Sequence, residues 1–218
     1  MTSLNYTSER IDHLGIVAGM CNKIGLINTI DEQIGPTERK VSVGQAVQAM
    51  VLNGLGFVGR PLYLTPEFFA NKPVDLLIGS ELEAADLNDD SLGRALDAVY
   101  EYGVTELFVS VAKRGLDEFE IKPIYRHLDS TTFSLHGQYD QNEEETEIKI
   151  TYGYSKDKRP DLKQAVLALI CSHQSAIPTW LGALDGNQSD KSSFPEIIQA
   201  YRKQLEEGDE GYLQFCIR

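Results

Sequence analysis

The chain is poor in cysteine, in basic residues and in long apolar runs. Its 218 residues include three cysteines, Cys21, Cys171 and Cys216, which lie far apart and form no Cys-x-x-Cys pair. This argues against a disulfide framework and against a zinc knuckle, and favours a reducing compartment. No window approaches the roughly 18 uninterrupted apolar residues of a membrane helix, and the start lacks a basic segment followed by an apolar one. We therefore expect a cytoplasmic protein with no membrane partner.

Basic residues are outnumbered in both halves of the sequence. The net charge is −13; residues 1–120 carry 9 Lys and Arg against 18 Asp and Glu, and residues 121–218 carry 11 against 15. Adhesion to nucleic acid through a broad charged face is disfavoured, because neutralising phosphates requires clustered cations. A local basic patch is still compatible with this composition.

The pattern of apolar residues changes near residue 118. Before it, apolar residues recur at three- and four-residue steps, Gly25 predicts a break between two helices, and Ser42 with Gln45 predicts a capping box. Asp90 or Ser91 is the expected N-cap of a later helix. After residue 118 the composition is rich in strand-forming residues with period two, in "IYRHLDSTTFSLHG", "LKQAVLALICS" and "AIPTWLGALDG".

The end of the sequence predicts a helix and a further strand. "SSFPEIIQAYRKQLEEG" offers Ser193 and Glu196 as a capping box with Pro195 in the first turn, and "GYLQFCIR" resembles a strand. The expected fold is α+β: a helical amino-terminal domain over residues 1–118, then a strand-strand-strand-helix domain over residues 119–218. A hydrophobic content of 42% is enough to give it a core.

Asp129 is a lone carboxylate in the first expected strand, "HLDSTTFSLHG". His127, Asp129 and Thr131 would project from one face of that strand. A carboxylate there can bind Mg²⁺, but phosphoryl-transfer sites need more than one such ligand. His127 and His136 fall into no recognisable spacing with a carboxylate. From these residues alone, Asp129 is either a metal ligand or the polar end of a structural strand.

Two later segments also carry polar groups. "YGYSKDKRPDLKQ" combines two tyrosines with four cations, Lys156, Lys158, Arg159 and Lys163, and suits either a nucleic-acid backbone or an ordinary solvated loop. "GALDGNQSDKSS" offers Asp185 and Asp190 as metal ligands or as capping residues of a turn.

These segments, taken in order, resemble insertion-sequence transposases of the DDE type, whose catalytic domain is RNase H-like. The resemblance rests on "LDSTTFSLHG", "YGYSKDKRPDLKQ" and "GNQSDKSS", with "VSVGQAVQAMVLNGLGFVGRPLYL" similar to the helical domain that precedes the catalytic one. It covers nearly the whole chain. It implies DNA transposition by metal-dependent phosphodiester cleavage and strand transfer, with Asp129 as the first acidic residue of the triad and a ligand of Mg²⁺ or Mn²⁺.

The same resemblance implies an incomplete triad. In the family the second Asp lies on the strand after the predicted helix and the Glu comes much later, so the chain is expected to be carboxy-terminally truncated and inactive alone. The implied partner is DNA, the terminal repeats of a mobile element; we assign Lys156, Lys158, Arg159 and Lys163 to DNA binding by inference. The alternative is a non-catalytic DNA-binding or regulatory, inhibitory module that pairs with intact transposase, and the chain itself is a further possible partner. An unrelated α+β protein that binds neither DNA nor metal is the third hypothesis.

Overall fold

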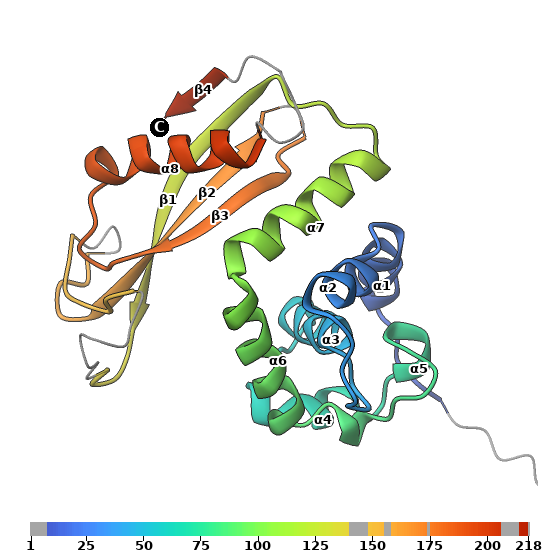
Figure 1. Cartoon of the computed structure of the whole chain (residues 1–218). Coiled ribbons are helices and arrows are strands. Elements are labelled where there is room, and N and C mark those ends of the chain that lie inside the picture. Colours follow the sequence, from blue (N-terminus) through green and yellow to red (C-terminus); the bar gives the residue numbers. More distant parts are fainter. Residues whose placement is uncertain (1–7, 140–147, 155–157, 174, 206–213, 218) are drawn as a thin grey trace, which may run out of the picture. The chain divides into compact units, whose positions relative to one another are not determined.

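The computed structural model describes residues 8–139, 148–154, 158–173, 175–205 and 214–217, with backbone only for residues 205 and 214–217. The chain divides into two compact units, Met1–Phe119 and Glu120–Arg218. The first unit is helical and the second contains the sheet (Figure 1). The predicted order of helices, three strands and a further helix is confirmed, and the structure shows that the three strands pair antiparallel.

The first unit consists of short helices. They are α1 (Leu14–Lys23), α2 (Leu26–Ile34), α3 (Val43–Leu55), η1 (Leu62–Leu64), α4 (Thr65–Phe69), α5 (Val74–Leu77), η2 (Ala84–Asp86), α6 (Asp89–Tyr102) and α7 (Val104–Glu118). Among the described residues, no helix combines the length and apolar composition that a membrane span requires.

The predicted helix signals of this unit are mostly confirmed. Gly25 adopts φ +67° between α1 and α2, a left-handed conformation that glycine tolerates best. The Ser42 hydroxyl accepts a hydrogen bond from the Gln45 amide, and the Gln45 side chain accepts one from the Ser42 amide. The cap of α6 was predicted too late: Asn88, rather than Asp90 or Ser91, accepts from the Ser91 amide.

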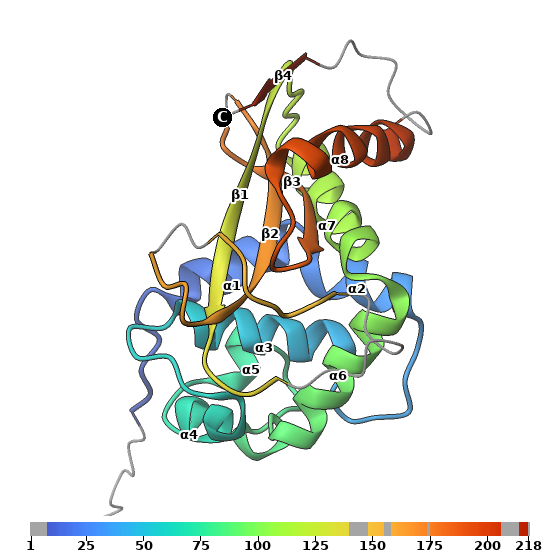
Figure 2. The same cartoon turned by 90° about the vertical axis from the view of Figure 1, so that its left-hand side faces the viewer.

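Helix α3 forms the centre of the first core. It contacts α1, α2, α4 and α6, and Figure 2 shows it running through the middle of the helical unit. Ala46, Ala49 and Leu52 are almost completely buried. Gly44, where α3 passes α2, has its amide bonded to the Asp31 carboxylate at 2.7 Å. A Cβ on Gly44 would lie 2.5 Å from the Ile27 carbonyl oxygen, so the two helices approach through this glycine.

In the part of the second unit that the structure describes, the chain forms a four-stranded sheet and one helix. Its strands are β1 (Tyr125–Leu135), β2 (Lys163–Ser172), β3 (Pro178–Leu184) and β4 (Gln214–Ile217), in the order β3-β2-β1-β4. The first three are antiparallel neighbours, whereas β4 runs parallel to β1. Outside these strands, Thr151 forms an isolated antiparallel bridge with Gln164 of β2.

Helix α8 (Asp190–Leu205) covers one face of this sheet (Figure 1). Its inward residues Phe194, Ile197 and Tyr201 are buried, as are Leu128 and Ile170 on the strands. The spacing of the helix residues is that of one helical face, and the strand residues share one side of the pleat. Because successive side chains of β1 point to opposite faces of the sheet, every second residue of this strand lies under the helix.

A chain of hydrogen bonds crosses the buried interface between α8 and the sheet. The Arg126 Nε donates to the Tyr201 hydroxyl at 2.7 Å, which donates to Thr179 Oγ1 at 3.0 Å. Thr179 in turn donates to the Ile170 carbonyl. Arg126, Tyr201 and Thr179 are all buried, so these bonds satisfy polar groups that would otherwise carry a desolvation cost.

The predicted capping box of Ser193 and Glu196 was wrong, because helix α8 starts before these residues. It begins at Asp190, and Ser193 is buried inside it with its hydroxyl donating to the Ser189 carbonyl at 3.0 Å. Pro195 lies within the helix rather than in its first turn. The added turn is stabilised because Ser130 Oγ donates to the Asp190 carboxylate at 2.6 Å, which ties the helix start to β1.

The close approach of α2 and α3 yields a stability prediction. Gly44→Ala should lower the free energy of unfolding by about 1–3 kcal/mol, because its methyl group would overlap the Ile27 backbone. Gly54→Ala, in the same helix with nothing within 4 Å of the added Cβ, should be neutral or stabilising by up to about 1 kcal/mol. Urea denaturation of both variants measures the difference; equal effects would contradict the packing assigned to Gly44.

Candidate functional site on the sheet

Asp129 lies on the face of the sheet opposite α8. Along β1, Arg126, Leu128 and Ser130 are buried, whereas Asp129 and Thr131 between and after them are exposed. Asp129 faces Leu169 of β2 in the antiparallel register. Its Oδ1 accepts a hydrogen bond from the Ser130 amide at 2.8 Å. The carboxylate is thus held by its own strand while its face of the sheet is accessible to solvent.

The strand β4 runs parallel to β1 on the side away from β2. The register pairs His127 with Cys216 and Leu128 with Ile217, so Asp129 lies one residue beyond the last described pair of the two strands. Asp129 is the fifth of the eleven residues of β1 and therefore lies within a strand that has neighbours on both sides.

Two histidines meet on the same face as Asp129. His127 Nε2 lies 2.6 Å from His173 Nδ1, and the ring centroids are 4.8 Å apart. Tyr125 packs edge-on against His173, with centroids at 6.2 Å. Sequence reasoning missed His173, because the pair is created by the antiparallel register that places His127 opposite Cys171, where β1 begins and β2 ends. No spacing along the chain indicates it.

The Asp190 carboxylate forms its hydrogen bond on the face of the sheet that α8 covers, opposite to the face of Asp129. The carboxylate accepts from Ser130, whose side chain points away from the Asp129 face because the two residues are adjacent on the strand. The other carboxylate of that segment, Asp185, accepts from the Lys149 amide at 2.8 Å. Of the two roles considered for these residues, the observed contacts are those of loop and helix-start stabilisation.

The three segments on which the transposase resemblance rests are neighbours in space. Gln164 is buried, its Nε2 donates to the Gly186 carbonyl at 2.6 Å, and its backbone pairs with Thr151 in both directions. A Cβ on Gly153 would lie 2.1 Å from the Gly186 carbonyl oxygen, so the backbones approach where only glycine fits. Together with the contact from Ser130 to Asp190, this joins all three segments into one local structure.

The four cations that were predicted to bind DNA differ in their contacts and exposure. Lys156 lies outside the described residues. Lys163 donates to the Gln138 carbonyl and, at 3.0 Å, to the Tyr139 carbonyl, which holds the loop after β1. Arg159 forms two hydrogen bonds with Asp161, at 2.9 and 2.7 Å, and this lowers the pKa of Asp161 to about 2. Lys158 is exposed at φ +57°. Their assignment to DNA stays a prediction.

The described residues do not assemble a complete metal site. Across residues 8–139, 148–154, 158–173 and 175–204, no group of three or more His, Cys, Asp and Glu side chains is arranged to hold a metal ion. Asp129 provides a hard oxygen ligand of the type that Mg²⁺ and Mn²⁺ prefer. The His127 and His173 pair provides nitrogen ligands, which suit softer cations.

Substitutions of Asp190 and Asp129 should differ in their effects on stability. Asp190→Ala should lower the free energy of unfolding by about 1.5–3 kcal/mol, because it removes a hydrogen bond to a charged group in a partly buried setting. Asp129→Ala should change it by less than about 0.5 kcal/mol, as expected for an exposed side chain. Denaturant melts of the two variants give the comparison, and a large loss at Asp129 would indicate a structural role for it.

Comparison with known proteins gave one match. Residues 6–113 match the family described as Domain of unknown function (DUF4277), a region that lies entirely in the helical unit. No curated protein and no solved structure matched the chain. The helical unit is thus similar to DUF4277, and the sheet unit, which contains Asp129, lies outside the matched region.

Proposed function

We propose that the sheet unit is the first part of an RNase H-like domain of a DDE-type transposase, in which Asp129 is a metal ligand. The observation that carries this proposal is the position of Asp129: an exposed carboxylate within β1, on the face not covered by α8, in a strand that has neighbours on both sides. The order β3-β2-β1-β4, with the helix between β3 and β4, also supports the proposal.

The chemistry proposed is cleavage and joining of DNA phosphodiester bonds. In two-metal sites, bound cations activate the attacking oxygen and stabilise the leaving oxygen of an in-line displacement. Asp129 would bind one such cation through its carboxylate, with water completing the shell as Mg²⁺ usually requires. The strand holds the carboxylate in place, because Ser130 donates its amide to it and Leu128 and Ser130 anchor the strand on the other face.

The proposal assigns no strand transfer to the described residues by themselves. They contribute one carboxylate to such a site, and a two-metal centre needs several. In the family the second carboxylate lies on the strand after the helix, which is the position of β4, and residues 214–217 of β4 contain no carboxylate. A single carboxylate gives weak cation binding, so the test must detect an ion that exchanges rapidly.

Paramagnetic broadening by Mn²⁺ in amide NMR spectra tests the proposal. Low concentrations of Mn²⁺ should broaden the signals of residues 127–131 and of Leu169 selectively, and Asp129→Asn should abolish this effect. Asp161→Asn is the matched control, because that carboxylate is exposed and bound to Arg159. His173→Gln should leave the broadening in place, which distinguishes the carboxylate from the histidine pair. Broadening that persists in Asp129→Asn would refute the assignment.

A further inference from the structure

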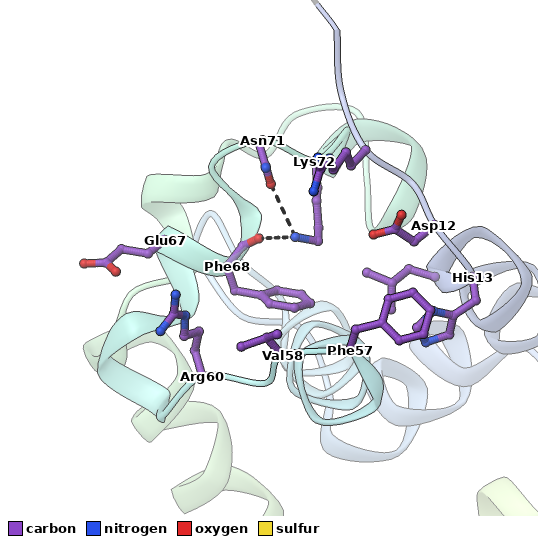
Figure 3. A pocket seen from close by; sticks show the side chains of 12 residues that line it. Asp12, His13, Phe57, Val58, Arg60, Glu67, Phe68, Asn71 and Lys72 are labelled. Atoms are coloured by element: carbon purple, nitrogen blue, oxygen red, sulfur yellow. Dashed lines mark hydrogen bonds between the residues drawn. The ribbon is translucent and has the colours of Figure 1, made fainter.

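A cavity in the helical unit carries three cations. It has a volume of about 360 Å³, within the range of roughly 300–1,000 Å³ typical of small-molecule sites (Figure 3). Arg10, Arg60 and Lys72 line it, together with the rings of His13, Phe57 and Phe68. It is formed by the chain before α1, the loop after α3, and α4 with the residues following it.

The cations are concentrated in an acidic unit. Residues 1–119 contain nine Lys and Arg against 17 Asp and Glu, and three of these nine line this one cavity. Among the described residues, none of the three lies within 4.0 Å of a carboxylate oxygen, whereas Lys40 and Arg94 of the same unit do. Cations without a paired carboxylate are available to an incoming anion.

Lys72 is held in place by uncharged groups. Its Nζ donates to the Phe68 carbonyl at 2.6 Å and to Asn71 Oδ1 at 3.4 Å, and it lies 4.0 Å from the centroid of the Phe68 ring. Burial lowers the pKa of Lys72, and the nearby Asp12 carboxylate partly offsets this effect. A bound anion would act in the same direction as Asp12, because a nearby negative charge favours the ammonium form. The site therefore has a positioned positive charge.

Phe57 presents an aromatic surface next to these cations. Its side chain is 80% exposed, which is unusual for phenylalanine. His13 supports it: the two ring centroids are 4.4 Å apart, and His13 Nε2 donates to the Leu55 carbonyl at 2.7 Å, which fixes the imidazole. In Figure 3 the rings of Phe57 and His13 lie together on one side of the cavity, and Arg60 lies across from them. An exposed ring held in this way suits stacking with a planar group.

Two carboxylates limit the kind of anion that fits. Asp12 and Glu67 also line the cavity, so its formal charge is three positive against two negative, and the rest of the unit is acidic. A DNA duplex presents closely spaced phosphates and requires an extended basic face. A single phosphate joined to an unpaired base needs only a local positive site and an aromatic surface, which is what the cavity offers.

We infer that this cavity binds one nucleotide of single-stranded DNA, with the phosphate on Arg10, Arg60 and Lys72 and the base on Phe57. This site is separate from Asp129, requires no metal, and goes beyond the proposed function of the sheet unit. It gives the helical unit a role in binding unpaired DNA.

Fluorescence anisotropy with a labelled oligothymidine in EDTA tests the inference. One neutralised phosphate predicts that the logarithm of the binding constant falls with the logarithm of salt concentration with a slope of roughly −0.7 for a single strand. Arg60→Gln should weaken binding at low salt by about ten-fold, because it removes a charge-assisted contact to that phosphate. Arg39→Gln, at an exposed arginine of the same unit outside the cavity, should leave binding unchanged. Phe57→Ala should weaken binding by about five- to a hundred-fold at an unchanged slope.

Two controls show that a loss of binding comes from the cavity and not from unfolding. Arg60 and Phe57 are exposed, so circular dichroism of their variants should show intact helices. Leu76→Ala is the matched control for Phe57→Ala, because Leu76 is 67% exposed and its loss removes an apolar surface group outside the cavity. Free thymidine monophosphate should displace the oligonucleotide at lower concentration than inorganic phosphate. The inference is overturned if the oligothymidine fails to bind, if Arg60→Gln and Arg39→Gln behave alike, if a duplex binds more tightly, or if phosphate competes equally well. Because EDTA is present, failure here leaves the Asp129 proposal untouched.

Discussion

The packing of α8 against one face of the sheet is the constraint on which the second unit depends. Burial of Phe194, Ile197 and Tyr201 against Leu128 and Ile170 supplies the apolar part, and the bonds from Arg126 through Tyr201 to Thr179 connect the helix with β1 and β3. Successive residues of a strand point to opposite faces. Once Leu128 and Ser130 lie under the helix, Asp129 must lie on the other face.

This arrangement gives neighbouring polar residues different roles. Ser130 bonds to Asp190 under the helix and fixes where α8 begins, whereas Asp129, one residue earlier, is exposed. The glycines at 153 and 186 allow the flanking loops to meet around Gln164. The contacts among the three segments that carry the transposase resemblance thus stabilise the local structure, whereas Asp129 is exposed on the open face of the sheet, with its Oδ1 accepting from the Ser130 amide.

Sequence patterns predicted the elements better than the contacts between them. Period two identified β1, β2 and β3, and the Ser42 and Gln45 capping box marked the start of α3, because these signals are local. The start of α8 was misplaced because a tertiary contact, from Ser130 to Asp190, adds a turn before Pro195. The pairing of His127 with His173 and the clustering of Arg10, Arg60 and Lys72 depend on register and chain folding, so spacing along the sequence gave no sign of them.

We propose that a divalent cation binds to the Asp129 carboxylate on the open face of the sheet. Crystals of the protein soaked in Mn²⁺, with diffraction data collected for anomalous scattering from manganese, locate the ion directly. We expect an anomalous peak within coordination distance of the Asp129 carboxylate. A peak bound by His127 and His173 without Asp129, or peaks only at other carboxylates, would contradict it.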